Sequence, residues 1–157
     1  MSKNTIPLEQ ARWQLAIVWF VCAGIIFAIL IIQSIGGVYG EEVQRVWSWA
    51  LPNFLPTLAL MVSVFAADAL RPEQDTTYLV RKNFYTLSWW LSIFYLLAIM
   101  LSILSPPIVN YFSTQPIADR IKILEVSNLW LGPLQGLVVV ALGILFFLKQ
   151  DDDEDGK

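Results

Sequence analysis

Four long intervals of the sequence contain no Asp, Glu, Lys or Arg. They comprise 28 residues between Arg12 and Glu41, 22 between Arg45 and Asp68, 36 between Lys82 and Asp119, and 23 between Glu125 and Lys149. A helix needs about 20 mostly apolar residues to cross a hydrocarbon core about 30 Å thick. We therefore expect four transmembrane helices, over residues 13–35, 49–70, 86–107 and 126–148.

This pattern predicts an all-α integral membrane protein in which the four helices form two helical hairpins within residues 13–148. Only 15% of the chain is charged and 57% is hydrophobic, whereas soluble domains are about a quarter charged. Residues 1–12 would form an N-terminal segment. Residues 149–157 carry a run of acidic side chains that repel one another, so we expect a disordered tail there.

The distribution of Lys and Arg predicts the orientation of the spans. Positive residues beside a span favour the cytoplasmic side, and the predicted topology places seven of them on the side of both termini and three on the other. The seven are Lys3, Arg12, Arg71, Arg81, Lys82, Lys149 and Lys157, against Arg45, Arg120 and Lys122. We expect a protein of the plasma (inner) membrane with cytoplasmic termini.

The amino-acid composition excludes most of the common catalytic sites. The chain has no His and a single Cys, Cys22, so it offers no histidine base, no Cys/His metal site and no internal disulfide. Ten basic against 13 acidic residues do not favour nucleic acid as a partner. We expect a protein that is not an enzyme and needs no cofactor.

Neutral polar side chains concentrate in the second and fourth spans. Such residues either line a pore or form hydrogen bonds between helices. The candidates for either role are Asn53, Thr57, Asn128 and Gln135.

Three prolines interrupt the same two spans. Each removes a backbone donor inside a helix, so Pro52, Pro56 and Pro133 are predicted to kink their helices and to leave carbonyl groups that need other partners. Bent backbone at this depth is tolerated where it packs on protein or lines water, so these segments are expected to face other helices.

Small residues mark one side of the fourth span. Gly132, Gly136 and Gly143 lie near one helical face, which allows another backbone to approach closely. The neighbour is either the first or second span of the same chain, or another copy of the chain.

Ionisable residues are missing from the middle of the spans, which disfavours a proton-coupled pump. The carboxylate nearest to a span is Asp68. Arg71 follows three residues later on the same helical face, which predicts an ion pair at the membrane interface.

Two further patterns have competing interpretations. Trp13–Trp19 matches Trp89–Tyr95 at three positions, and Trp49 and Trp130 each begin a Trp-x-x-Pro motif. A duplicated hairpin or chance similarity between apolar segments explains these matches. Residues 116–125 alternate apolar and charged residues at helical spacing, as expected of a short interfacial helix or of the first turns of the fourth span.

Two functions of different classes follow. The first is a small membrane protein that associates with copies of itself as a channel, pore or membrane effector, with a cytoplasmic protein as a further partner. The alternative is an accessory subunit that anchors a larger complex in the lipid bilayer. A pore needs a continuous polar or dewettable path, whereas an anchor needs only a docking surface.

Overall fold

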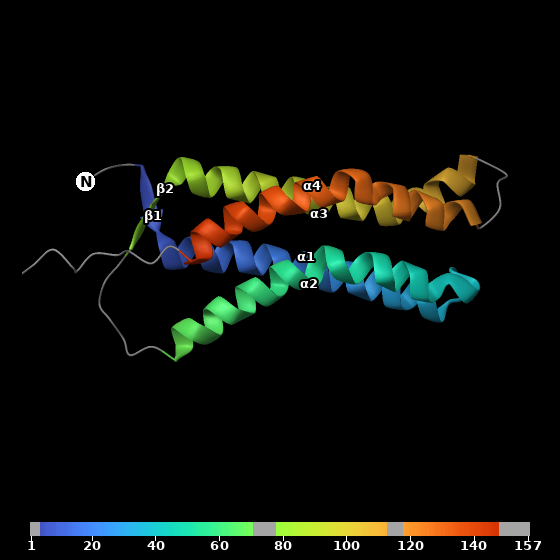
Figure 1. The fold of residues 1–157 in the computed structure, drawn as a ribbon, viewed down its shortest axis with the longest axis horizontal. Helices are drawn as coiled ribbons and strands as arrows, with labels where there is room; N and C mark the ends of the chain where they lie inside the picture. Colours follow the sequence, from blue (N-terminus) through green and yellow to red (C-terminus); the bar gives the residue numbers. More distant parts are fainter. Residues whose placement is uncertain (1–3, 71–77, 113–117, 148–157) are drawn as a thin grey trace, which may run out of the picture.

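The computed structural model describes residues 4–70, 78–112 and 118–147, most of which lie in four helices (Figure 1). These are α1 (Leu8–Ile35), α2 (Val43–Ala69), α3 (Lys82–Phe112) and α4 (Ala118–Phe147), with a 3-10 helix, η1 (Gly40–Glu42), before α2. Each α-helix contains a stretch long and apolar enough to cross a membrane. The predicted all-α class with four such helices is confirmed.

The helices begin earlier than the apolar pattern indicates. α1 starts at Leu8 and α4 at Ala118, so charged residues such as Arg12 and Glu125 lie inside the helices. The expectation of a separate interfacial helix over 116–125 is wrong, because residues 118–125 are the first turns of α4. No Gly or Pro occurs between Ala118 and Leu131 to interrupt that helix.

A two-stranded sheet connects the chain's first described residues to the segment before α3. Strand β1 (Thr5–Pro7) pairs antiparallel with β2 (Leu79–Arg81), with Ile6 opposite Val80. The pairing continues at both ends, where Leu8 N donates to Tyr78 O at 2.9 Å and Lys82 N donates to Asn4 O at 2.8 Å. The apolar pattern of the sequence does not predict a strand in residues 1–12.

The helices lie roughly along one long axis, and α4 packs against both α2 and α3 (Figure 1). The starts of α1 and α3 lie beside β1 and β2, at what we call the sheet end of the bundle. The end with η1 is called the η1 end. There Gly37 and Gly40 have φ values of 70° and 53°, in the left-handed region that favours glycine.

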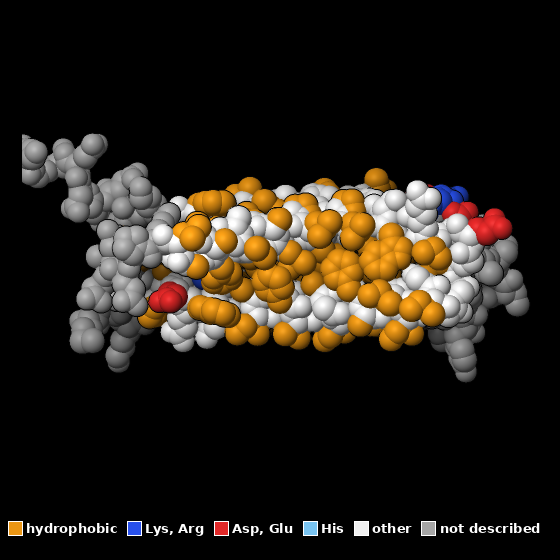
Figure 2. Space-filling model, turned by 90° about the horizontal axis from the view of Figure 1, so that it is seen from below, with side chains coloured by type: hydrophobic (Ala, Val, Ile, Leu, Met, Phe, Trp, Pro, Cys, Tyr) orange, Lys and Arg blue, Asp and Glu red, His pale blue; other side chains and the backbone are white. Residues whose placement is uncertain are grey.

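Large apolar and aromatic side chains fill the space between the helices, with Trp19, Phe54, Met61, Tyr95 and Ile99 all fully buried. The outer surface is also apolar. On the face drawn in Figure 2, hydrophobic side chains extend along the length of the bundle and charged side chains lie near its two ends. A surface of this kind is suited to hydrocarbon rather than to water.

Candidate functional site

Polar side chains meet between the helices in the half of the bundle nearer η1. We call Trp49, Asn53, Tyr95, Ser127 and Gln135 the polar seam; they come from α2, α3 and α4. Trp49 and Asn53 are one helical turn apart, so they share one face of α2.

Asn53 and Tyr95 join α2 to α3. The Tyr95 hydroxyl donates to the backbone carbonyl of Asn53 at 3.0 Å and lies 3.2 Å from its side-chain Oδ1. The Asn53 amide Nδ2 donates to Trp49 O at 2.7 Å, within α2. Both side chains are buried, and these hydrogen bonds replace the water that the groups lose.

Trp49 and Ser127 join α2 to α4 closer to the η1 end. The indole Nε1 of Trp49 donates to Ser127 Oγ at 3.1 Å, and Ser127 Oγ donates to Leu124 O at 2.6 Å. Ser127 thus serves as acceptor and donor at once, which only a hydroxyl side chain can do in so small a volume.

Gln135 bonds to a carbonyl group that a proline leaves without its helical donor. In an α-helix the carbonyl of Pro52 would accept from the N–H of residue 56, but Pro56 has none. Gln135 Nε2 donates to Pro52 O at 2.7 Å and so supplies that donor from α4. The rings of Pro52, Pro56 and Pro133 themselves lie on exposed sides of their helices, which the sequence did not predict.

The four polar candidates therefore separate into different positions. Asn53 and Gln135 make hydrogen bonds between helices of one chain, while Thr57 is buried and its hydroxyl has no partner among the described residues. Asn128 is exposed on α4. Asn53 and Thr57 are thus buried inside a single bundle, whereas Gln135 is half-buried and its bond to Pro52 O lies at the surface.

The glycines of α4 face away from the bundle. Gly132 and Gly136 are exposed, Gly143 is half-buried, and a Cβ atom placed on any of the three would meet no described atom within 4 Å. In the described structure, these glycines therefore do not pack closely against α1 or α2 of the same chain.

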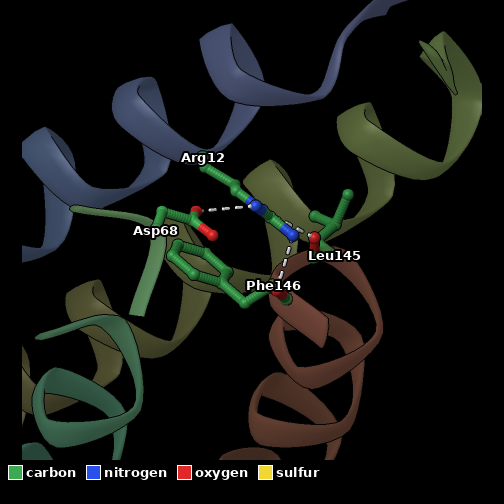
Figure 3. Close-up of polar contacts among 4 residues, drawn as sticks. All are labelled: Arg12, Asp68, Leu145 and Phe146. Atoms are coloured by element: carbon green, nitrogen blue, oxygen red, sulfur yellow. Dashed lines mark hydrogen bonds and ion pairs between the residues drawn. The ribbon is translucent and has the colours of Figure 1, made fainter. Parts of the chain in front are cut away.

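Arg12 holds three helices together at the sheet end (Figure 3). Its guanidinium donates through Nε to Leu145 O at 3.1 Å and through Nη2 to Phe146 O at 2.6 Å, and Nη1 lies 3.0 Å from Asp68 Oδ2. The cation also lies 6.0 Å from the centre of the Phe146 ring. One side chain thus caps the C-terminal carbonyls of α4 and pairs with the end of α2.

Asp68 has a partner that the sequence did not predict. Asp68 was predicted to pair with Arg71, which lies outside the described residues, and the structure pairs it with Arg12 of α1. The signal that was missed is topological. Arg12 directly precedes the first predicted span and Asp68 lies in the last turn of the second, so the predicted topology places both at the same side of the membrane.

A second ion pair connects helices at the η1 end. Arg45 Nη2 lies 2.5 Å from Glu125 Oε1 of α4, and Nη1 lies 3.1 Å from Glu42 Oε2. These groups are about half exposed, so water screens them.

Among the described residues, no three acidic or cysteine side chains lie close enough together to hold a metal ion.

Comparisons with protein-family models, with curated proteins and with solved structures give no match to this chain. The functional argument therefore rests on the polar seam, the exposed face of α4 and the two ends of the bundle.

Proposed function

We propose that this chain is a non-enzymatic membrane protein that associates with a second copy of itself through α4 and serves as an accessory or anchoring subunit. The observation that carries the proposal is the outward face formed by Asn128, Gly132 and Gly136. These residues are spaced by four, so they follow one side of the helix.

The chemistry of this face favours a second copy as its partner. Glycines let two backbones approach closely within a bilayer, where packing rather than the hydrophobic effect drives helix association. A two-fold axis along the membrane normal would bring identical residues of two α4 helices to the same depth. The Asn128 amide contains both a donor and an acceptor, so two copies of it can bond to each other.

Burial supports an internal duplication of one helical hairpin as the origin of the fold. The sequence alignment of α1 with α3 pairs Ala16 with Ser92, Trp19 with Tyr95, Ala23 with Ile99 and Ile26 with Ser102, and every member is buried. The Trp-x-x-Pro alignment of α2 with α4 pairs five sets of buried residues, although Trp49 is buried and Trp130 is exposed: Val46 with Ser127, Ala50 with Leu131, Thr57 with Val138, Met61 with Leu142 and Val64 with Leu145.

A channel is the second candidate function, and the polar seam is the observation that favours it. Conduction through one bundle would use Asn53, Tyr95 and Gln135 in the half near η1. The opposite half is packed with apolar side chains such as Leu15, Met61 and Leu142, which are fully buried. Because large apolar side chains fill most of the described interior of this half, the packed bundle fits an anchoring subunit better.

The first experiment measures the mass of the protein in detergent or nanodiscs and then ion flux into liposomes from the same sample. Our proposal predicts a dimer with no flux. Gly132→Ile with Gly136→Ile should give a monomer, whereas Gly24→Ile on α1, an exposed position equally free of neighbours, should leave the dimer intact. A monomeric wild type contradicts self-association. Flux that changes with Asn53→Leu and Gln135→Leu supports the channel instead.

For localisation, we propose the plasma (inner) membrane with cytoplasmic termini. Two features support a shared side for both termini. The first is the excess of Lys and Arg on the predicted side of both termini, and the second is the bond from Arg12, near the start of α1, to Phe146 O at the end of α4.

A further inference from the structure

Three buried polar atoms at the centre of the bundle have no hydrogen-bond partner among the described residues. They are Trp19 Nε1, Thr57 Oγ1 and Ser92 Oγ, on α1, α2 and α3. A buried polar group without a partner is costly, and native proteins satisfy such groups with ordered water where the protein offers nothing else.

Each of the three residues is linked to the contact between Tyr95 and Asn53, by ring packing or by its position on the same helix. The rings of Trp19 and Tyr95 pack together with their centres 5.8 Å apart. Ser92 precedes Tyr95 by three residues on α3 and Thr57 follows Asn53 by four on α2, so each is about one helical turn from that contact. All five residues are buried.

Neighbouring hydrogen bonds explain why the Thr57 hydroxyl does not bond to a carbonyl group of its own helix. A threonine inside a helix usually donates to the carbonyl four residues earlier, which here is the Asn53 carbonyl. In an α-helix that oxygen accepts from the Thr57 N–H, and here it also accepts from the Tyr95 hydroxyl at 3.0 Å, so both of its lone pairs are used. Thr57 therefore needs an acceptor from elsewhere.

Ser92 differs from the other described serines of α3 in the same way. Ser88 donates to Phe84 O at 3.0 Å, Ser102 to Ala98 O at 2.8 Å and Ser105 to Ser102 O at 2.9 Å. Ser92 makes no such bond although it is fully buried.

The indole of Trp19 is also unlike its counterparts. The Nε1 atoms of Trp47 and Trp49 each donate to a serine hydroxyl, Ser34 and Ser127, at 3.1 Å. Trp19 Nε1 has no such acceptor among the described residues.

We propose that Trp19, Asn53, Thr57, Ser92 and Tyr95 form an internal site that binds water within the membrane-spanning bundle. The side chains supply donors at the indole and the hydroxyls, and acceptors at Asn53 Oδ1 and at the hydroxyl oxygens. Water is the ligand because it both donates and accepts, and because one molecule can join groups from three helices without a charge to desolvate.

The test is oxidation of the full chain in nanodiscs by hydroxyl radicals generated from bound and bulk water by X-rays. After correction for intrinsic reactivity, Trp19 and Tyr95 should be oxidised at least about fivefold faster than Phe54, because radicals form at the water molecules beside them. Phe54 is the matched control, since all three side chains are equally inaccessible. Equal protection of all three residues overturns the proposal.

The sign of a stability change gives an independent measurement. If water bonds to Thr57, then Thr57→Val removes that bond and lowers the unfolding midpoint in SDS. If the site is dry, the same change removes an unpaired hydroxyl and raises the midpoint. Ser92→Ala should also lower the midpoint by more than Ser102→Ala, which removes only a bond within one helix. A raised midpoint for both Thr57→Val and Ser92→Ala counts against the site.

Discussion

The side-chain amide of Gln135 on α4 donates to the backbone carbonyl of Pro52 on α2 at 2.7 Å. This carbonyl is the one that Pro56 deprives of its helical donor. A glutamine on one helix therefore compensates for a proline on its neighbour, which allows α2 to keep two prolines within a continuous helix.

The first prediction concerns the energy of this bond. Gln135→Leu should destabilise the protein by about 0.6–2 kcal/mol, because it leaves Pro52 O without a donor in an apolar environment. In a Pro56→Ala background the backbone N–H of residue 56 is restored, so the same substitution should cost less. The measurement is a double-mutant cycle from SDS unfolding. Equal costs in both backgrounds would show that the two residues are not coupled.

The second prediction concerns Arg12. Arg12→Lys keeps the charge but loses the planar fork that reaches two carbonyls and a carboxylate, so it should cost about 1–3 kcal/mol. Amide hydrogen exchange over the last turn of α4 should also become faster. Asp68→Asn is the control. It removes the charge that pairs with Arg12, where Asp68 is 40% exposed, and should cost about 1 kcal/mol or less. Unchanged exchange in Arg12→Lys would refute the capping role.

The third prediction concerns the buried bond between Trp49 and Ser127. Ser127→Ala leaves the indole Nε1 without an acceptor and should lower the free energy of unfolding by about 1–3 kcal/mol. Adding Trp49→Phe removes the unpaired indole donor. The free energy of unfolding of the double variant should therefore be little lower than that of Trp49→Phe alone. Additive losses would show that the bond contributes nothing.

The number and class of the helices could be predicted because a bilayer imposes a simple length requirement on uncharged segments. Helix ends could not be placed in this way. Arg12 lies within α1 because Asp68 and the α4 carbonyls neutralise and bond its guanidinium, and Glu125 lies within α4 opposite Arg45. Partners from other helices make charged residues acceptable there.

The polar candidates were found by type, but not their contacts. Asn53 and Gln135 were chosen because amides are rare in apolar spans, whereas Tyr95 and Ser127 were missed because either residue is common there. The spacing of Trp49, Asn53 and Thr57 by four was the available signal, since it places all three on one face. Which helix that face meets depends on tertiary packing, which no single span encodes.

The last prediction concerns orientation in the membrane. With Cys22 replaced by Ser, a cysteine at Val38 lies in the exposed connection between α1 and η1, and one at Tyr78 lies beside β2 at the opposite end. Because the predicted topology places the excess of Lys and Arg on the side of both termini, a membrane-impermeant maleimide added to intact cells should label Val38→Cys. Tyr78→Cys should react only after the membrane is opened. The reverse pattern would place the termini outside, and labelling of both positions in intact cells would contradict a chain that crosses the membrane four times.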